Sequence, residues 1–144
     1  MYACKEGHTD VVKLLLEDVK EKINFNAKCL NLETAFFKAC HNGHTDIVQM
    51  LLDHPDVNID FNAKYDDFRM TALMWACRRG HKDVVKLLLH HSEELREKRG
   101  QGVIDLDTED NHGKTAQMLA SSHTIVQLLL DSRNKITLRV TAPF

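Results

Sequence analysis

The sequence predicts an all-α solenoid, a stack of helix–turn–helix units with short β-hairpin loops between them. One sequence motif occurs three times with small changes: CKEGHTDVVKLLL from Cys4, CHNGHTDIVQMLL from Cys40 and CRRGHKDVVKLLL from Cys77. The turn glycines of the three copies are 36 and 37 residues apart, at Gly7, Gly43 and Gly80. A weaker copy, TAQMLASSHTIVQLLL, begins at Thr115. Because so short a unit cannot form its own core, each unit must bury its apolar face against its neighbours.

The composition excludes several classes of protein. The chain has 144 residues, of which 43% are hydrophobic and 28% charged, as in ordinary folded domains. Its net charge of -2 gives no general attraction to nucleic acid or to anionic membranes. No apolar run approaches the roughly 20 residues that span a bilayer, and the N-terminal stretch lacks a signal core. Four cysteines without a sign of secretion indicate reduced thiols and an intracellular setting, cytoplasmic or nuclear.

Each unit is predicted to contain two helices. The first begins at a threonine, which caps helix starts well because its hydroxyl accepts a hydrogen bond from a free amide: Thr34, Thr71 and Thr115. The glycine of the Gly-His turn suits a helix end that needs positive φ. The second helix carries apolar pairs, and Asp46 and Asp83 lie at its start, where a negative charge favours the helix dipole. The charged segment from His90 could extend the third unit's second helix as far as Gly100.

The segments between units show a different pattern. INFNAK from Ile23, IDFNAK from Ile59 and VIDLDTE from Val103 alternate apolar and polar residues, which predicts short extended arms followed by turns. KITLRV from Lys135 shows the same alternation and is predicted to be a further extended arm. We expect one domain over residues 1–144, with units near 1–22 (truncated), 23–58, 59–103 and 104–134 (degenerate) and a C-terminal stub at 135–144.

These residues resemble the ankyrin-repeat family, whose unit is a β-turn plus two helices with a T-P-L-H-x-A signature. The signature is similar to TAFFKA, TALMWA and TAQMLA here, and the resemblance extends to the Gly-His turns and to Asn26-Ala27 and Asn62-Ala63. The chain departs from the family where Phe37, Met74 and Met118 replace the signature histidine, so a family hydrogen bond to the loop is expected to be absent. Glycine at the hairpin tip survives only as Gly113. Leu32 and Arg69 stand at the other two tips, and we expect these to avoid positive φ.

Catalytic and metal chemistry have weak support. Cysteine precedes histidine by four residues in three units, but a zinc site needs four ligands brought together and these pairs belong to separate packed units. The pattern favours buried thiols beside turn histidines. The remaining histidines are scattered, and neither a Gly-rich phosphate loop nor an H-E-x-x-H motif occurs. Basic residues are interleaved with acidic ones, and Trp75 is interpreted as a packing residue. We therefore predict no enzyme activity, cofactor, metal or nucleic-acid partner.

The resemblance implies a protein-recognition module that binds a protein partner through its hairpin tips and concave helix face. Those positions vary between units while the scaffold stays fixed, as expected for solvent-facing residues. At the helix ends they are Lys5, Glu6, His41, Asn42, Arg78 and Arg79. At the tips they are Leu30, Asn31, Glu33, Asp67, Phe68, Met70, Asn111, His112 and Lys114. Phe68 is either an aromatic anchor for the partner or a residue packed on the neighbouring hairpin.

The first unit suggests an alternative role. Met1 aligns with Met74, so the first helix of this unit is short and one apolar flank lacks a polar capping unit. Another repeat, another domain or another chain could cover that flank. The alternative function is thus a stacking element of a longer array, or end-to-end self-association through the uncapped N-terminal unit.

Overall fold

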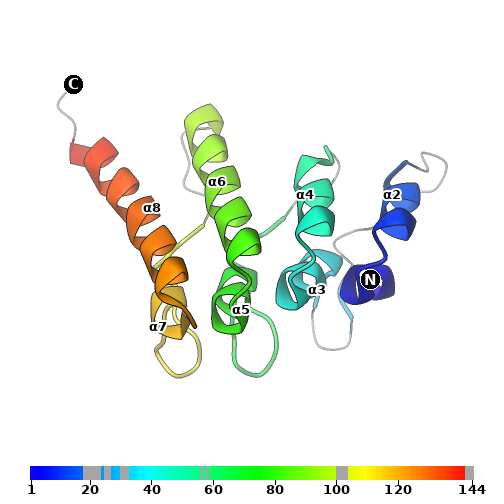
Figure 1. The fold of residues 1–144 in the computed structure, drawn as a ribbon, viewed down its shortest axis with the longest axis horizontal. Helices are drawn as coiled ribbons and strands as arrows, with labels where there is room; N and C mark the ends of the chain where they lie inside the picture. Colours follow the sequence, from blue (N-terminus) through cyan, green and yellow to red (C-terminus); the bar gives the residue numbers. More distant parts are fainter. Residues whose placement is uncertain are drawn as a thin grey trace.

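The helices stack as four successive pairs in a row. A computed structural model describes residues 1–17, 24, 27–29, 33–55, 57, 59–99 and 104–141, without the side chains of 99 and 139–141. The described helices are α1 (Tyr2–Glu6), α2 (Thr9–Glu17), α3 (Ala35–Asn42), α4 (Thr45–Asp53), α5 (Ala72–Arg79), α6 (Lys82–Arg99), α7 (Ala116–Leu119) and α8 (His123–Thr141). In Figure 1 the short odd-numbered helices follow one edge of the row and the even-numbered helices the other. The loops before α5 and α7 project beyond the first edge.

Stacking produces one continuous core. The odd-numbered inner helices contact each other in sequence, and so do the even-numbered outer helices. Phe37, Met74 and Leu88 are almost completely buried. Ala39 and Ala76 are fully buried, so small side chains allow close packing of the inner helices. The fold class predicted from the repeats is confirmed, and among the described residues the only β-bridge joins Tyr65 and Met70 at the base of one hairpin loop.

Threonine caps begin two of the inner helices as predicted. Thr34 Oγ1 accepts a hydrogen bond from the Phe37 amide at 3.2 Å, and Thr71 Oγ1 accepts one from Met74 at 3.3 Å. The Thr115 side chain makes no capping bond to α7. The Met74 sulfur also accepts from the Thr71 amide at 3.4 Å, which completes a capping box. In the third unit, Met74 replaces the signature histidine, and its sulfur is a second side-chain acceptor at the start of the helix.

The Gly-His turns bond successive units to each other. Gly7, Gly43 and Gly80 have φ between 78° and 80°, the left-handed conformation that the sequence predicts. The ring of His44 donates from Nε2 to the Lys5 carbonyl at 2.8 Å. The ring of His81 donates from Nε2 to the backbone carbonyl of His41 at 3.1 Å. A Cβ on Gly43 would lie 2.6 Å from the His81 ring. Gly7 and Gly43 are therefore also needed for the approach of the next unit's histidine.

The fourth unit replaces this contact with a serine. Ser121 stands where the turn is shortened, and its hydroxyl and amide both donate to the Cys77 carbonyl, at 3.2 and 3.1 Å. The last inner helix, α7, is correspondingly reduced to four residues. The degenerate copy thus keeps the inter-unit hydrogen bond while losing the Gly-His pair.

Two predictions about local conformation are wrong. The arm from Ile59 is not extended: the Ala63 amide donates to the Asp60 carbonyl at 3.3 Å, closing a turn, although Phe61 is buried as the alternation implied. Arg69 has a φ of 55°, so this tip does adopt positive φ without glycine. The Tyr65–Met70 bridge fixes the hairpin ends and forces the tip to close. Leu32 and most of the arm from Ile23 lie outside the described residues.

The predicted arm from Lys135 is also wrong, because residues 135–141 continue α8. Leu128, Ser132 and Ile136 recur every four residues, which keeps one helix face toward α6. Ser132 is buried and Ile136 packs against the core. The charged segment after His90 does extend α6, which runs to Arg99. Helical periodicity overrode the short alternation that had suggested a strand.

Candidate functional site

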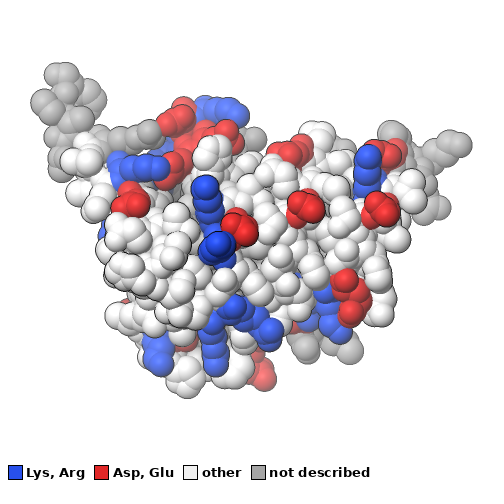
Figure 2. Space-filling view, in the orientation of Figure 1, with Lys and Arg blue, Asp and Glu red and all other residues white. Residues whose placement is uncertain are grey.

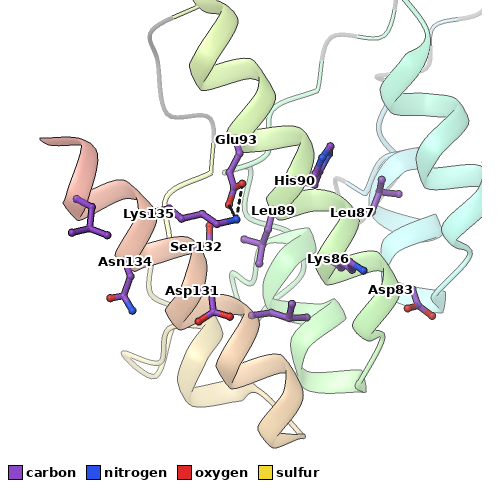
Figure 3. Close-up of a pocket in the computed structure, with 12 residues that line it drawn as sticks. Asp83, Lys86, Leu87, Leu89, His90, Glu93, Asp131, Ser132, Asn134 and Lys135 are labelled. Atoms are coloured by element: carbon purple, nitrogen blue, oxygen red, sulfur yellow. Dashed lines mark hydrogen bonds and ion pairs between the residues drawn. The ribbon is translucent and has the colours of Figure 1, made fainter. Parts of the chain in front are cut away.

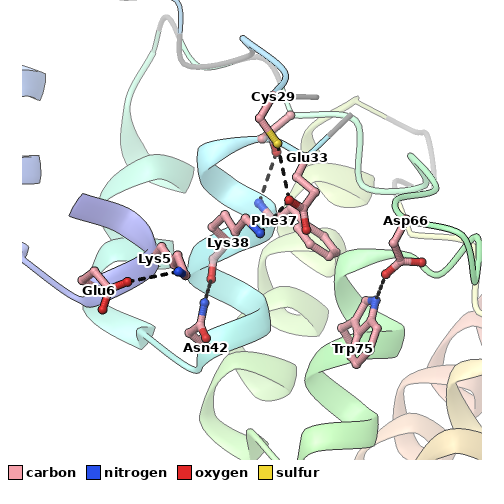
Figure 4. A network of polar contacts seen from close by, with 10 residues as sticks. Lys5, Glu6, Cys29, Glu33, Phe37, Lys38, Asn42, Asp66 and Trp75 are labelled. Atoms are coloured by element: carbon pink, nitrogen blue, oxygen red, sulfur yellow. Dashed lines mark hydrogen bonds and ion pairs between the residues drawn. The ribbon is translucent and has the colours of Figure 1, made fainter. Parts of the chain in front are cut away.

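The hairpin of the third unit is fixed to the helix that follows it. Tyr65 and Met70 exchange two backbone hydrogen bonds at 3.0 and 3.2 Å. The Asp66 carboxylate accepts one bond from the Phe68 amide at 2.8 Å and another from the Trp75 indole at 2.6 Å. Asp66 therefore holds both the tip and the indole of α5 in place. Figure 4 shows its contact with the indole.

The hairpins of the third and fourth units are also bonded to each other. The Asn111 amide donates to the Phe68 carbonyl at 2.9 Å, and the Asn111 side chain donates to Asp67 at 3.0 Å. Behind the tips, Lys64 donates to the Glu109 carbonyl at 2.7 Å. The two tips thus form one platform beside α5, built from segments more than forty residues apart.

Four rings form a row across three units, which we call the aromatic row: His41, Trp75, Phe68 and His112. The centroids of successive rings are 4.7, 6.2 and 6.5 Å apart. Phe68 remains 42% exposed although it contacts rings on both sides. Phe68 therefore has features of both interpretations: it packs on the neighbouring hairpin, and it still presents apolar surface to solvent.

Two arginines lie over this row. The Arg78 guanidinium is 5.2 Å from the Trp75 ring centroid and 5.7 Å from that of Phe68, and the Arg79 guanidinium is 5.5 Å from Trp75. Cation–π attraction of this kind contributes roughly 0.5–1 kcal/mol at an exposed site. Both arginines are exposed, and no described carboxylate forms an ion pair with either. Figure 2 shows basic side chains gathered on the lower edge, below α5 and α7.

His41 closes the row on the side of the second unit. Burial lowers the pKa of its imidazole, and the positive charge of Arg79 lowers it further. Its Nδ1 atom is buried without a hydrogen-bond partner among the described residues. The ring is therefore neutral near pH 7 and acts as an aromatic face against Trp75 and Phe37, with ring centroids 4.7 and 5.7 Å away.

The structure brings together only part of the predicted site. Asp67, Phe68, Arg78, Arg79, Asn111 and His112 gather at the platform, with His41 at its edge. Lys114 is exposed on the fourth unit's hairpin, and Lys5 and Glu6 form an ion pair of 3.3 Å on α1. Asn42 is half-buried, and its side chain donates to the Lys38 carbonyl at 2.9 Å. Leu30 and Asn31 lie outside the described residues.

Two predicted contact residues are instead buried. Met70 is fully buried because its side chain enters the core at the end of the hairpin. Glu33 is 9% exposed and forms an ion pair of 2.6 Å with Lys38, and it also accepts a hydrogen bond from the Cys29 thiol at 3.4 Å (Figure 4). Both residues flank their tips on the side of the following helix, where the chain turns inward. Neither is available to a partner.

Trp75 and Asp66 are the residues that the sequence interpretation missed. Trp75 was expected only to pack, yet together with Asp66 it supports the exposed ring of Phe68 and the two arginines. A local signal existed. Arg78 and Arg79 follow Trp75 by three and four residues, the helical spacing that places them next to its ring.

The repeated cysteines are structural. Cys4, Cys40 and Cys77 are buried, and burial raises the pKa of the Cys40 thiol and raises the pKa of Cys77 to about 12. Their thiols are thus poor nucleophiles. Cys29, which is not one of the repeated cysteines, is half-buried. The described residues contain no group of histidine, cysteine or carboxylate side chains arranged to hold a metal ion.

A groove lies away from the aromatic row, between the outer helices α6 and α8. This groove of about 670 Å³ has apolar walls and a charged rim (Figure 3). Leu87, Leu89, Leu128 and Leu138 line it. Lys135 and Glu93 form an ion pair of 3.1 Å across it. The helical course of residues 135–141 creates this groove, which was not expected because this segment was predicted to be an extended arm.

Comparison with known families agrees with the observed stack. The family described as "Ankyrin repeats (3 copies)" matches residues 1–99 and 60–140. The chain belongs to the ankyrin-repeat family. Ankyrin repeats are generally protein–protein interaction modules and are typically non-catalytic. No curated protein matches the chain significantly. None of the helices in the described part of this ankyrin-repeat chain has the length and apolar character needed to cross a membrane.

Proposed function

We propose that this ankyrin-repeat chain binds a protein partner through the aromatic row and the joined hairpin tips of the third and fourth units. The observation that carries the proposal is the exposed ring of Phe68, supported by Trp75 and covered on one side by Arg78. Aromatic and arginine side chains dominate the binding energy of many protein interfaces. Here both kinds occur together on one surface.

Preorganisation strengthens this argument. Ordering a flexible side chain on binding costs roughly 0.5–1.5 kcal/mol, which lowers affinity. The Asp66 carboxylate already fixes the indole and the tip, and Asn111 already joins the two hairpins. A partner would therefore meet a surface whose shape is set before binding.

The test compares two exposed apolar residues on opposite faces. Wild-type chain captures partners from a cell extract, and the affinity of each purified candidate is measured for Phe68→Ala and Leu138→Ala. We expect Phe68→Ala to weaken binding by about tenfold or more, as an interface anchor does. Leu138→Ala, which removes a side chain that is 70% exposed on the outer groove, is the matched control. If only Leu138→Ala weakens binding, the outer groove is the interface and the proposal is wrong.

The exposed side chains of the first unit favour a second candidate, self-association of two copies through α1 and α2. Val11, Leu14 and Leu15 are exposed there, at 46, 67 and 40%. Light scattering after size exclusion measures the mass across a range of concentrations. Self-association predicts a rising mass that Leu14→Glu abolishes and Leu138→Glu leaves unchanged. A constant monomer mass contradicts it.

A further inference from the structure

The same two positions of the inner helices carry different charge in successive units. At the end of α1 they hold Lys5 and Glu6, which neutralise each other in an ion pair of 3.3 Å. At the end of α3 they hold His41, whose pKa is lowered by burial and by Arg79, and the uncharged Asn42. At the end of α5 they hold Arg78 and Arg79. At these two positions, positive charge is thus greatest in the third unit.

A guanidinium that lies over a ring keeps N–H donors for other partners. In Arg78 one of these donors, Nη1, already contacts the Met70 sulfur at 3.8 Å, and the others are not used by this contact. Arg78 and Arg79 place their guanidinium groups over the Trp75 ring, 5.2 and 5.5 Å from its centroid. A stacked guanidinium uses its flat face for the ring, while its N–H donors lie in its own plane and can form two parallel bonds to a carboxylate. The acidic side chain nearest this indole, Asp66, already accepts from Trp75 and Phe68 and is half-buried. Among the described residues, neither arginine forms an ion pair with a carboxylate.

We infer that Arg78 and Arg79 bind carboxylates of an acidic peptide segment of the partner, in a register that places an adjacent apolar side chain on Phe68. This inference rests on the proposed function and names the chemistry of the partner at that site. Arg78 lies over both Trp75 and Phe68, so the cation and the apolar ring are within reach of neighbouring residues of one extended peptide.

Single-stranded nucleic acid fits the same surface less well. It also combines arginine with stacked rings, but its affinity comes from a basic groove that follows many phosphates. The platform instead carries Asp66 and Asp67 on the same hairpin as Phe68, and the chain has a net charge of -2. A short acidic peptide needs only the two arginines, which form no ion pair among the described residues, and the neighbouring ring of Phe68.

The experiment selects a displayed library of random peptides on the intact chain. We expect selected peptides to be enriched in Asp and Glu at a fixed distance from an apolar residue. A synthetic selected peptide should bind at least tenfold more tightly than its Asn and Gln counterpart, and added salt should reduce that difference. Arg78→Gln/Arg79→Gln should remove the acidic preference. Arg78→Lys/Arg79→Lys, which keeps the charge without the planar fork, should retain only part of it.

The control removes the same number of charges from the outer helices, as Lys13→Gln/Lys86→Gln, and should leave selection unchanged. Unfolding by urea is measured for every variant, so that loss of fold is separated from loss of binding. Enrichment without acidic bias overturns the inference. So does an acidic bias that survives in Arg78→Gln/Arg79→Gln, or tighter binding of a single-stranded oligonucleotide than of the selected peptide. If Phe68→Ala still abolishes partner binding in any of these cases, the proposed function stands and only the acidic chemistry is wrong.

Discussion

Two helices of this protein contain the same seven residues and have different environments. DVVKLLL occurs at 10–16 in α2 and at 83–89 in α6. Val11 is 46% exposed whereas Val84 is fully buried, and Leu15 is 40% exposed whereas Leu88 is 1% exposed. The side chains are identical, so their burial depends on the neighbours of each unit. Helix α6 lies between α4 and α8, while α2 packs against α1 and α4.

The comparison separates the burial that a unit provides by itself from the burial that its neighbours in the stack provide. Val12 and Val85, at equivalent positions, are both almost completely buried, so burial at this position is the same in the two copies. A stack of this kind gains stability from nearest-neighbour interfaces. The same substitution should therefore have different effects in the two copies.

The largest difference is expected for the leucine at equivalent positions in the two copies. Leu88→Ala should lower the free energy of unfolding by about 2–5 kcal/mol, since a large side chain is removed from a closed core. Leu15→Ala removes the same atoms from a site that is already half solvated, and should cost less than about 1 kcal/mol. Urea titration followed by circular dichroism measures both. Equal losses would contradict the neighbour-dependent account of burial.

The junctions between units provide a second comparison. Gly43 and Gly80 both have positive φ, which alone costs roughly 1–2 kcal/mol for alanine. A Cβ on Gly43 would also lie 2.6 Å from the His81 ring, but on Gly80 the nearest atom is the Ser121 hydroxyl at 3.0 Å. Gly43→Ala should therefore destabilise the chain more than Gly80→Ala in thermal unfolding. The reverse order would show that the histidine contact is not what restricts the junction.

Helix capping distinguishes the third unit from the degenerate fourth. Thr71→Ala removes the hydrogen bond to Met74 and should cost about 1 kcal/mol. Thr115→Ala removes no capping bond and should change the free energy of unfolding by less than about 0.5 kcal/mol, as surface substitutions usually do. Paired Thr→Ser variants, which keep the hydroxyl, serve as controls. A large loss for Thr115→Ala would mean that its hydroxyl has another role.

The smallest expected effect concerns pH. The pKa of His41 is lowered in the fold, first by burial and then by Arg79, from an ordinary value of 6.5. The unfolded chain then binds the proton more readily, so the stability that neutral His41 provides is complete above pH 6.5 and is lost as the pH falls below it. His41→Phe keeps a ring against Trp75 and should flatten the decrease between pH 7 and pH 5. Since burial also lowers the pKa of His91, part of the slope should remain. An unchanged slope in His41→Phe would contradict the assignment.

Local patterns predicted much of the scaffold but less of the site. The capping threonines and turn glycines were identified because a hydroxyl or a missing Cβ acts within a few residues along the chain. The positive φ of Arg69 was missed because a backbone bridge between Tyr65 and Met70 sets it, and Arg69 itself carries no such preference. Met70 was placed at the surface because its position in the loop does not reveal that its side chain turns into the core. The helical course of residues 135–141 was missed because the alternation of polar and apolar residues over 135–140 resembles a strand.

The sequence by itself determined the repeating unit and the family, since both follow from periodic residues and local backbone geometry. It also placed Phe68, Arg78 and Arg79 among the residues available to a partner. Only the tertiary structure decided that Phe68 and both arginines meet over Trp75, and which copy of DVVKLLL is buried. Those outcomes depend on contacts between units, and no pattern within one unit contains them.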